Sequence, residues 1–348
     1  MKKILILIPI IILIIIMKGI NMNKKTNIPD KIEKEEIKHI DKEKTNKIEK
    51  NNYFSYNGQL KIENNQLVNQ YNEPIQLRGI STHGIQWYGD YANESIMKTL
   101  KEEWNINLFR IAMYTNEGGY LVDKTLKEKV ENIVDIATKL DLYVIIDWHI
   151  LSDNNPMTNI EESKEFFKEI SEKYKNNKNI IYEICNEPNG GTTWDNDILP
   201  YAKEITKIIR ENTDGIIIVG TPMWSQQVLE AANNPIQEKN IMYALHFYSG
   251  THKEDLRNNA KEALKTIPIF ISEWGVSDAS GNNGVYLDEA EKWLEFINEN
   301  NLSWAVWSLS DKDESSALLK PGTSKTNITD NDLTEAGNFI KQQLINNK

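Results

Sequence analysis

Two glutamates follow short apolar runs of the chain in the same way. Residues 180–186 form an apolar, β-branched run that stops at Glu187 and Pro188, and residues 269–272 lead to Glu273. Such runs predict buried strands, and Pro188 marks a strand end because proline cannot donate to a strand ladder. A lone glutamate in this position is more often a helix cap or a surface charge. A pair can cleave a glycosidic bond, since one carboxyl protonates the leaving oxygen while the other attacks carbon or activates water.

Three of the five histidines lie at or just past the ends of expected strands. These are His83, His149 and His246, whereas His39 lies in a charged N-terminal segment and His252 in a polar loop. Each of the three alone could be a buried core histidine. Three at equivalent ends of different strands favour a common site with the glutamates.

Aromatic residues gather in the same segments. Sugar rings offer an apolar face and a rim of hydroxyls, so a sugar site combines aromatic platforms with a few polar groups. Core packing is the alternative role, and we expect it for Trp104, Trp293 and Trp304. The aromatic residues that follow expected strands are Trp87, Tyr114, Trp194, Trp224, Tyr248 and Trp307.

The sequence gives less support to a metal site, or to a serine or cysteine nucleophile, than to a pair of catalytic carboxyl groups. The sequence has no His-Glu-x-x-His and no Gly-x-Ser-x-Gly segment. Cys185 is the only cysteine, and it lies inside an apolar run, so we interpret it as a buried hydrophobic residue and expect no disulfide. We expect neither a metal nor a cofactor.

Strand-like and helical segments alternate along the chain and must position these residues. Helical spacing of apolar residues marks, for example, residues 124–139 and 201–211. A hairpin around Asn64 and Asn65, over residues 58–69, precedes the repeat. Eight alternations predict an α/β fold, a (β/α)8 TIM barrel with a short N-terminal β-hairpin that closes its bottom. An open doubly wound sheet is the alternative, but the sequence has no Gly-rich dinucleotide-binding loop to support it. The eight strand-like runs end near Ser81, Met113, Asp147, Cys185, Gly220, Phe247, Glu273 and Trp307.

The amino-acid composition and net charge limit the kinds of partner that the protein can bind. The 348 residues are 40% hydrophobic and 26% charged, which suits one large globular domain. The net charge of −11 argues against a nucleic-acid partner, because such proteins present a basic surface to phosphates. The net charge does not argue against a neutral substrate. We expect the protein to be a monomer.

The N-terminal residues predict export. Lys2 and Lys3 precede an apolar run at residues 4–17, which as a helix is about 21 Å long against about 30 Å of hydrocarbon. We therefore expect residues 1–22 to be a signal peptide, or a signal anchor if it stays uncleaved, so that the protein is secreted or held at the extracytoplasmic surface. Residues 23–52 lack aromatic residues and predict a disordered charged tether. Residues 53–348 form the expected catalytic domain.

Seven ordered segments at seven strand ends resemble family 5 of the glycoside hydrolases, and within it the bacterial endo-β-1,4-glucanases, or cellulases. The resemblance runs from about Tyr53 to the C-terminus. It implies cleavage of internal β-1,4 bonds of cellulose or related β-glucans. The segments are residues 78–87, 109–114, 145–149, 183–189, 246–248, 271–275 and 307–312.

The resemblance also implies roles for single residues. Glu187 becomes the general acid/base and Glu273 the nucleophile of a double displacement that retains anomeric configuration. Arg110 and His246 support the nucleophile side, and Tyr248 bonds Glu273. Contacts to sugar are implied for Asn186 at the 2-hydroxyl, for His83 and His149 beside the scissile bond, for Trp87, Tyr114, Trp224 and Trp307, and more distantly for Lys312 and Glu314.

Two alternatives stay open. The catalytic residues do not fix the sugar, so a related barrel hydrolase on mannan, xylan or mixed-linkage glucan fits the same pattern. The second alternative is a barrel that binds polysaccharide without cleaving it. The presence of both Glu187 and Glu273 argues against this alternative.

Overall fold

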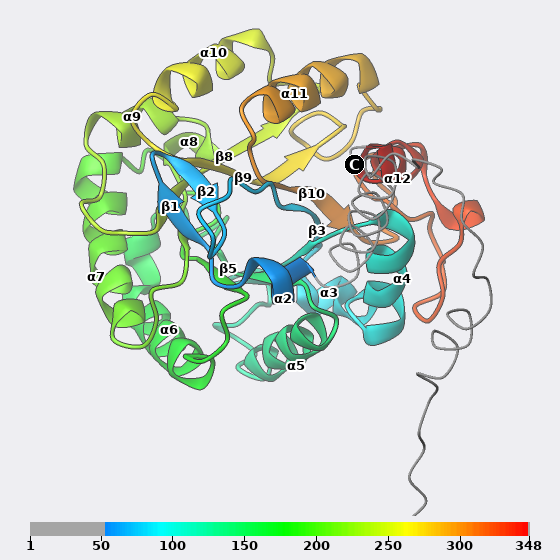
Figure 1. Ribbon diagram of the computed structural model, residues 1–348. Coiled ribbons are helices and arrows are strands. Elements are labelled where there is room, and N and C mark those ends of the chain that lie inside the picture. Colours follow the sequence, from blue (N-terminus) through cyan, green and yellow to red (C-terminus); the bar gives the residue numbers. More distant parts are fainter. Residues whose placement is uncertain (1–52, 347–348) are drawn as a thin grey trace, which may run out of the picture. The chain divides into compact units, whose positions relative to one another are not determined.

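A closed barrel of eight parallel strands forms the centre of the protein (Figure 1). The computed structural model describes residues 53–346. Strands neighbour one another in the order β10-β3-β4-β5-β6-β7-β8-β9 around the ring, which confirms the barrel and excludes the open sheet. The strands are β3 (Arg78–Thr82), β4 (Leu108–Tyr114), β5 (Tyr143–His149), β6 (Ile180–Glu183), β7 (Ile217–Val219), β8 (Ile241–Tyr248), β9 (Ile269–Gly275) and β10 (Trp304–Leu309).

At least one helix follows each barrel strand, and the helices surround the barrel in Figure 1. In α5 the residues Leu126, Val130, Ile133, Val134 and Ala137 are buried, as their helical spacing predicts. The helices around the barrel are α4 (Glu94–Trp104), α5 (Leu126–Lys139), α6 (Ile160–Lys173), α7 (Leu199–Arg210), α9 (Val228–Asn233), α10 (Glu254–Ala263), α11 (Leu287–Glu299) and α12 (Glu335–Asn346). Three shorter helices are α2 (Tyr53–Asn57), which precedes the hairpin, α3 (Ile85–Tyr88), which follows β3, and α8 (Pro222–Ser225), which follows β7.

The expected hairpin is present and closes the N-terminal end of the barrel. Strands β1 (Lys61–Glu63) and β2 (Gln66–Val68) pair antiparallel. Asn64 and Asn65 have φ of 52° and 59°, as a tight hairpin turn requires. Leu60 and Leu67 join a buried cluster with the first residues of the barrel strands, so the hairpin seals the end opposite the strands' carboxyl ends.

A larger apolar core lies between the barrel and its helices and contains Trp104, Trp293 and Trp304, as expected. Cys185 is buried in the same core, which confirms its packing role. Within residues 53–346, no helix combines the length and the apolar character that crossing a membrane requires. The export segment (residues 1–22) and the tether (residues 23–52) predicted above lie outside the described residues.

Candidate active site

A cleft of about 700 Å³ opens at the carboxyl ends of the strands. Because parallel strands present their carboxyl ends at one face, residues far apart in sequence meet there. Arg110 and Asn186 are buried directly behind the floor of the cleft, where Arg110 donates to Glu273 and Asn186 contacts His149. The cleft brings together the other predicted residues His83, Trp87, Tyr114, His149, Glu187, Trp224, His246, Tyr248, Glu273, Trp307, Lys312 and Glu314.

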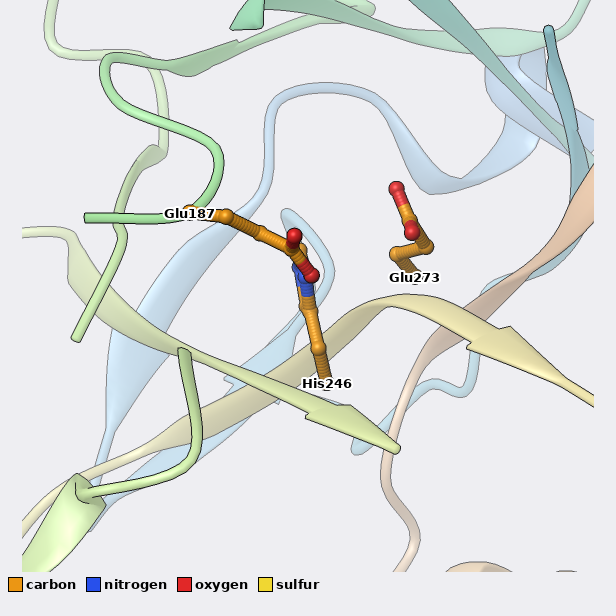
Figure 2. A group of neighbouring side chains, drawn as sticks. All are labelled: Glu187, His246 and Glu273. Atoms are coloured by element: carbon orange, nitrogen blue, oxygen red, sulfur yellow. The ribbon is translucent and has the colours of Figure 1, made fainter. Parts of the chain in front are cut away.

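Glu187 and Glu273 face one another across the cleft floor, with His246 beside Glu187 (Figure 2). One side-chain oxygen of each glutamate and one ring nitrogen of His246 lie within 4.8 Å of one another. Both glutamates are buried. The two carboxyl groups can therefore contact the same bond of a bound molecule.

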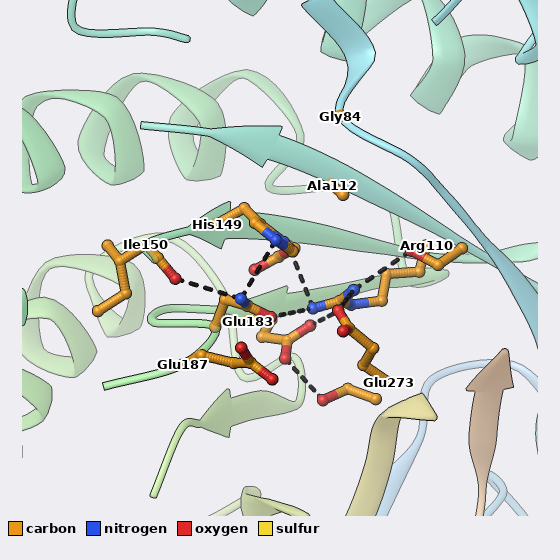
Figure 3. A network of polar contacts seen from close by, with 12 residues as sticks. Gly84, Arg110, Ala112, His149, Ile150, Glu183, Glu187 and Glu273 are labelled. Atoms are coloured by element: carbon orange, nitrogen blue, oxygen red, sulfur yellow. Dashed lines mark hydrogen bonds and ion pairs between the residues drawn. The ribbon is translucent and has the colours of Figure 1, made fainter. Parts of the chain in front are cut away.

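Arg110, buried on β4, holds four groups of the floor together (Figure 3). Its Nε donates to Glu183 Oε2 at 2.7 Å, and its Nη1 donates to Glu273 Oε2 at 3.0 Å. Its Nη2 donates to Asn186 Oδ1 at 2.7 Å and pairs with Asp147 Oδ2 at 3.0 Å. Burial alone lowers the pKa of an arginine, but these carboxylates raise that of Arg110, which stays charged.

His246 acts on both glutamates. Its charge lowers the pKa of Glu273, in the sense that the resemblance implied, while its direct bond is to the other glutamate, since His246 Nδ1 lies 2.9 Å from Glu187 Oε1. Its Nε2 lies 2.9 Å from Ser272 Oγ, and that hydroxyl donates to Glu183 Oε1 at 2.6 Å. Since the serine proton is used for Glu183, Nε2 donates to Ser272. The chain of bonds links Glu187 to a buried acid of β6.

The partners of His246 make it a cation. Burial by itself lowers a histidine pKa, but the nearby carboxylates of Glu183 and Glu187 raise that of His246 to about 9. For Glu183, burial acts to raise the pKa and is outweighed by Arg110 and His246, which hold it at about 2. A protonated imidazole donates from both nitrogens, so His246 Nδ1 donates to Glu187 Oε1.

The two facing glutamates have opposite electrostatics. Burial raises the pKa of Glu187, and the charge of Glu273 adds to the rise, against the opposing effect of His246. Burial acts in the same direction on Glu273, but the charges of Arg110 and His246 outweigh it and lower its pKa. Tyr248 also donates to Glu273 Oε1 at 2.7 Å. Glu187 therefore keeps a proton where Glu273 is ionised.

Asn186 and His149 form the floor beside the glutamates. Asn186 Nδ2 lies 3.2 Å from His149 Nε2 and donates to Ile150 O at 3.2 Å. His149 Nδ1 lies 2.6 Å from Asp147 Oδ2. Burial lowers the pKa of His149 to about 3, so the ring is neutral.

One wall of the cleft is built from rings and one ion pair. The His83 ring lies 4.9 Å from that of Trp307, and the Tyr114 ring lies 4.1 Å from that of His149. Lys312 Nζ pairs with the buried Glu314 at 2.6 Å, and it lies 3.4 Å from His83 Nε2. Burial, with the lysine charge, lowers the pKa of His83 to about 3. These side chains come from the carboxyl ends of β3, β4, β5 and β10 or from the residues just after them, and the four strands are neighbours in the barrel.

The opposite wall carries Trp224, in a backbone segment with positive φ at Met223, Trp224 and Ser225. Ser225 Oγ donates to Asn186 O at 2.7 Å, and Trp224 N donates to Pro188 O at 3.0 Å. These bonds tie the segment after β7 to the segment that carries Glu187. The left-handed conformation is uncommon for such residues and is held here by its contacts.

The geometry agrees with a family match. A family model described as cellulase (glycosyl hydrolase family 5) matches residues 68–313. The chain belongs to glycosyl hydrolase family 5.

Among relatives of this family 5 chain, an endoglucanase of Clostridium saccharobutylicum is 53% identical over 294 residues, which are 83% of the chain and 66% of that protein. Endoglucanase A of Evansella cellulosilytica is 52% identical over 276 residues, or 78% of the chain and 57% of that protein. The chain thus spans about two thirds or less of the length of these curated relatives.

Solved structures share the whole barrel. The catalytic domain of Thermobifida fusca endoglucanase Cel5A is 34% identical, with a TM-score of 0.82 over 84% of this chain and 99% of that one. A structure from Cytophaga hutchinsonii is 41% identical, with a TM-score of 0.81 over 84% of this chain and 95% of that one.

Sequence reasoning missed part of the family 5 site. Asp147, Glu183 and Ser272 belong to the floor network, and each lies in a segment that carries the resemblance, but none of the three was given a role. Acidic residues within otherwise apolar strands were the available signal. His252, dismissed as a loop histidine, lines the cleft. The cleft also contains Glu117, Leu151, Met223, Gln226 and residues 279–281.

Trp194 does not take the role that its position suggested. It is buried, donates from Nε1 to Asn234 O at 2.8 Å and packs against the ring of Tyr243. The segment after β6 turns Trp194 toward the helix layer rather than the cleft. Position after a strand does not distinguish these two directions.

Glu187, His246 and Glu273 have a spacing that could hold a metal ion. Their atoms are already engaged, however: His246 contacts Glu187 and Ser272, and Glu273 accepts from Arg110 and Tyr248. An ion there would lie beside the Arg110 and His246 cations. The donor set suits paired carboxyl chemistry better than a metal site.

Proposed function

We propose that this chain is an endo-acting, retaining glycoside hydrolase that cleaves internal β-1,4-glucosidic bonds of cellulose or related β-glucans. One observation carries the proposal: two buried carboxyl groups meet at the cleft floor, and their surroundings raise the pKa of Glu187 and lower that of Glu273, so the proton favours Glu187. This division of protonation is what an acid and a nucleophile require.

In the first step Glu187 is the acid. Its Oε1 accepts from His246, so the transferable proton is on Oε2. That proton passes to the glycosidic oxygen while Glu273 attacks the anomeric carbon, the bond to the leaving sugar breaks, and a glycosyl ester forms on Glu273. In the second step the ionised Glu187 takes a proton from water, whose oxygen displaces Glu273. Two inversions at one carbon retain its configuration.

The separation of the carboxyl groups supports retention. Retaining enzymes hold the two groups about 5–5.5 Å apart, whereas inverting enzymes separate them by about 6.5–9.5 Å to admit a water. The oxygens of Glu187 and Glu273 that come within 4.8 Å fit the shorter spacing.

We assign the half of the cleft beside β10, β3, β4 and β5 to the sugars on the nonreducing side of the scissile bond. Asn186, with His149, faces the 2-hydroxyl there, while His83, Tyr114, Lys312 and Glu314 supply further contacts. Trp87, Trp224 and Trp307 are the stacking platforms. Trp87 and Trp224 stand in opposite walls and are 47% and 43% exposed, so a chain can extend past the catalytic pair in both directions, as endo-cleavage needs.

The substrate class rests on the relatives. Those at 53% and 52% identity are named endoglucanases. A variant of the Thermobifida fusca domain was solved with cellotetraose, and that domain is 34% identical to this chain. Assays on carboxymethylcellulose, lichenan, xylan and mannan, run side by side, separate β-1,4-glucan from the alternative sugars. A polysaccharide-binding barrel without catalysis would release no reducing ends from any of them.

Replacement of the nucleophile tests the mechanism. We expect Glu273→Ala to abolish hydrolysis and azide to restore turnover with an α-glycosyl azide as product, because the small anion fits where the carboxylate was. The wild-type enzyme should release the β-anomer first, observed by proton NMR. Near wild-type turnover by Glu273→Ala, or α-product released first, would contradict the assignment.

We also propose that residues 1–22 direct export and that the catalytic domain acts outside the cytoplasm as a monomer, secreted or held by residues 4–17. The positive start followed by an apolar run supports export. N-terminal sequencing of the exported protein tests it: a new N-terminus near residue 23 indicates a cleaved signal, and Met1 indicates an anchor.

A further inference from the structure

Asp147 is a buried acid of β5 that has no part in the mechanism above and does not line the cleft. Its Oδ2 lies 2.6 Å from His149 Nδ1 and 3.0 Å from Arg110 Nη2. Its Oδ1 is buried and has no hydrogen-bond partner among the described residues. Asp147 therefore acts on the site through its neighbours, and His149 is the one that reaches the cleft.

The orientation of Asn186 fixes the proton of His149. Arg110 Nη2 donates to Asn186 Oδ1 at 2.7 Å, so the other end of the amide, Nδ2, is the one that faces His149 Nε2 at 3.2 Å. An amide nitrogen only donates, so Nε2 must accept. A neutral imidazole with an accepting Nε2 carries its proton on Nδ1, where Asp147 Oδ2 receives it.

We propose that Asp147 is a positioning residue, whose Oδ2 keeps the His149 proton on Nδ1 so that His149 Nε2 and Arg110 together hold the Asn186 amide in one orientation. Without that acceptor, His149 is free to carry its proton on Nε2. Two donors would then face each other, and the amide must turn, which presents its NH2 group to the Arg110 guanidinium instead. The loss of one buried acceptor would misdirect an amide that lies one residue away from Glu187.

The effect on catalysis rests on the proposed function, in which Asn186 contacts the 2-hydroxyl of the sugar beside the scissile bond. Contacts to that hydroxyl strengthen in the transition state. A turned amide should therefore lower kcat and leave KM nearly unchanged, because an interaction made mainly in the transition state is lost.

Asparagine is an informative replacement at this position. Burial raises the pKa of Asp147, although Arg110 opposes the rise. Since Oδ2 accepts from both neighbours, a proton on this acid belongs on the unpartnered Oδ1. Asparagine reproduces that arrangement, with its oxygen at Oδ2 and its NH2 group at Oδ1, whereas leucine of similar shape offers no acceptor.

The first experiment locates the proton without using activity. Two-bond 15N–1H correlation spectra of the wild-type protein, assigned by comparison with His149→Gln, should show His149 protonated on Nδ1. They should show Nε2 protonation in Asp147→Leu and Nδ1 protonation again in Asp147→Asn. A wild-type His149 that carries its proton on Nε2 would overturn the proposal, whether or not Asp147→Leu folds and whether or not the protein hydrolyses glucan.

The second experiment measures kcat and KM on an aryl β-cellobioside and on its analogue lacking the 2-hydroxyl next to the aryl group. We expect Asp147→Leu to lower kcat on the first by about 100-fold and on the second by no more than about 3-fold, because the misdirected contact is absent there. Asp147→Asn should stay within about 3-fold of wild type on both. Equal losses on the two substrates, or no recovery in Asp147→Asn, would contradict the proposal.

Asp153 supplies a matched control. It is a buried acid six residues farther along the chain, bonded to the Thr115 hydroxyl and to Asn159, and it does not line the cleft. Asp153→Leu should leave the His149 proton on Nδ1 and affect both substrates equally. The same substrate-dependent loss in this variant would show that any buried acid on this segment has the effect, and would overturn the role of Asp147.

Discussion

Replacing His246 by glutamine removes a charge from the cleft floor and keeps a group that can donate to Glu187. In the wild-type protein His246 Nδ1 lies 2.9 Å from Glu187 Oε1, and Nε2 lies 3.6 Å from Glu183 Oε1. The side chain is buried, so water screens these pairs little. We expect the variant to be less stable than wild type by an amount that depends on pH.

The magnitude follows from the histidine pKa. It rises from 6.5 in the unfolded chain to about 9 in the folded one, which corresponds to about 3 kcal/mol at about 1.4 kcal/mol for each pH unit. Because the folded pKa is the higher one, this contribution is complete below pH 6.5 and is lost as the pH rises through 9. Breaking a buried ion pair costs about 3–5 kcal/mol, which agrees in size.

Urea denaturation of both proteins, below pH 6.5 and above pH 9, measures this contribution. The stability difference between wild type and His246→Gln should fall by about 3 kcal/mol between the two conditions. A difference that stays constant, or grows with pH, would refute the interpretation of His246 as a buried cation.

The same variant should move the pH profile of hydrolysis. His246 lowers the pKa of both Glu187 and Glu273. Without its charge, Glu273 ionises at higher pH and Glu187 holds its proton to higher pH, so both limbs of the kcat/KM profile should shift toward alkaline pH. A shift of either limb toward acid pH would contradict the assigned contacts.

Two further changes test the walls and the floor. Trp224→Ala should raise KM for cellopentaose about 3- to 10-fold, since stacking contributes about 0.5–1.5 kcal/mol. The same variant should leave KM for an aryl β-cellobioside unchanged. Equal effects on both substrates would contradict a stacking platform beyond the scissile bond. Gly220→Ala places a Cβ 2.1 Å from Cys185 O, so we expect a loss of about 1–3 kcal/mol in unfolding free energy and reduced activity as the Glu187 segment shifts. Gly215→Ala, whose nearest neighbour is 3.3 Å away, is the matched control, and an equal loss there would rule out the clash as the cause.

The fold was largely predictable because strand ends carry their own signals. The expected end at Ser81 lies one residue from the observed end of β3 at Thr82, and the end at Met113 lies one residue before that of β4 at Tyr114. Asn64-Asn65 and the helical spacing in α5 were equally local signals. Parallel strands joined by helices close in few ways, so local signals were enough to predict the barrel.

The sequence predicted most of the residues that form the site, but not which of them contact one another. Glu187 lies after β6 and Glu273 lies near the end of β9, where the sequence shows them. Asp147 and Glu183 are enclosed by apolar neighbours and resemble any polar residue of a strand. His246 bonds Glu187 rather than Glu273 because the ring points across the barrel, a direction that sequence spacing does not contain. Trp194 was misplaced for the same reason.

The balance of charge in the floor explains why the two glutamates differ. Arg110 and His246 are cations, and Glu183 and Glu273 have lowered pKa values and are anions, so these four groups sum to zero. Asp147 also contacts Arg110, but burial raises its pKa, so it adds no charge to this sum. A further anion would be uncompensated in this buried site, and the pKa of Glu187, like that of Asp147, is raised by burial. Glu273 accepts directly from Arg110, while Glu187 shares His246 with Glu183, so the proton belongs on Glu187. The proposed roles of acid and nucleophile therefore follow from which carboxyl group the guanidinium holds.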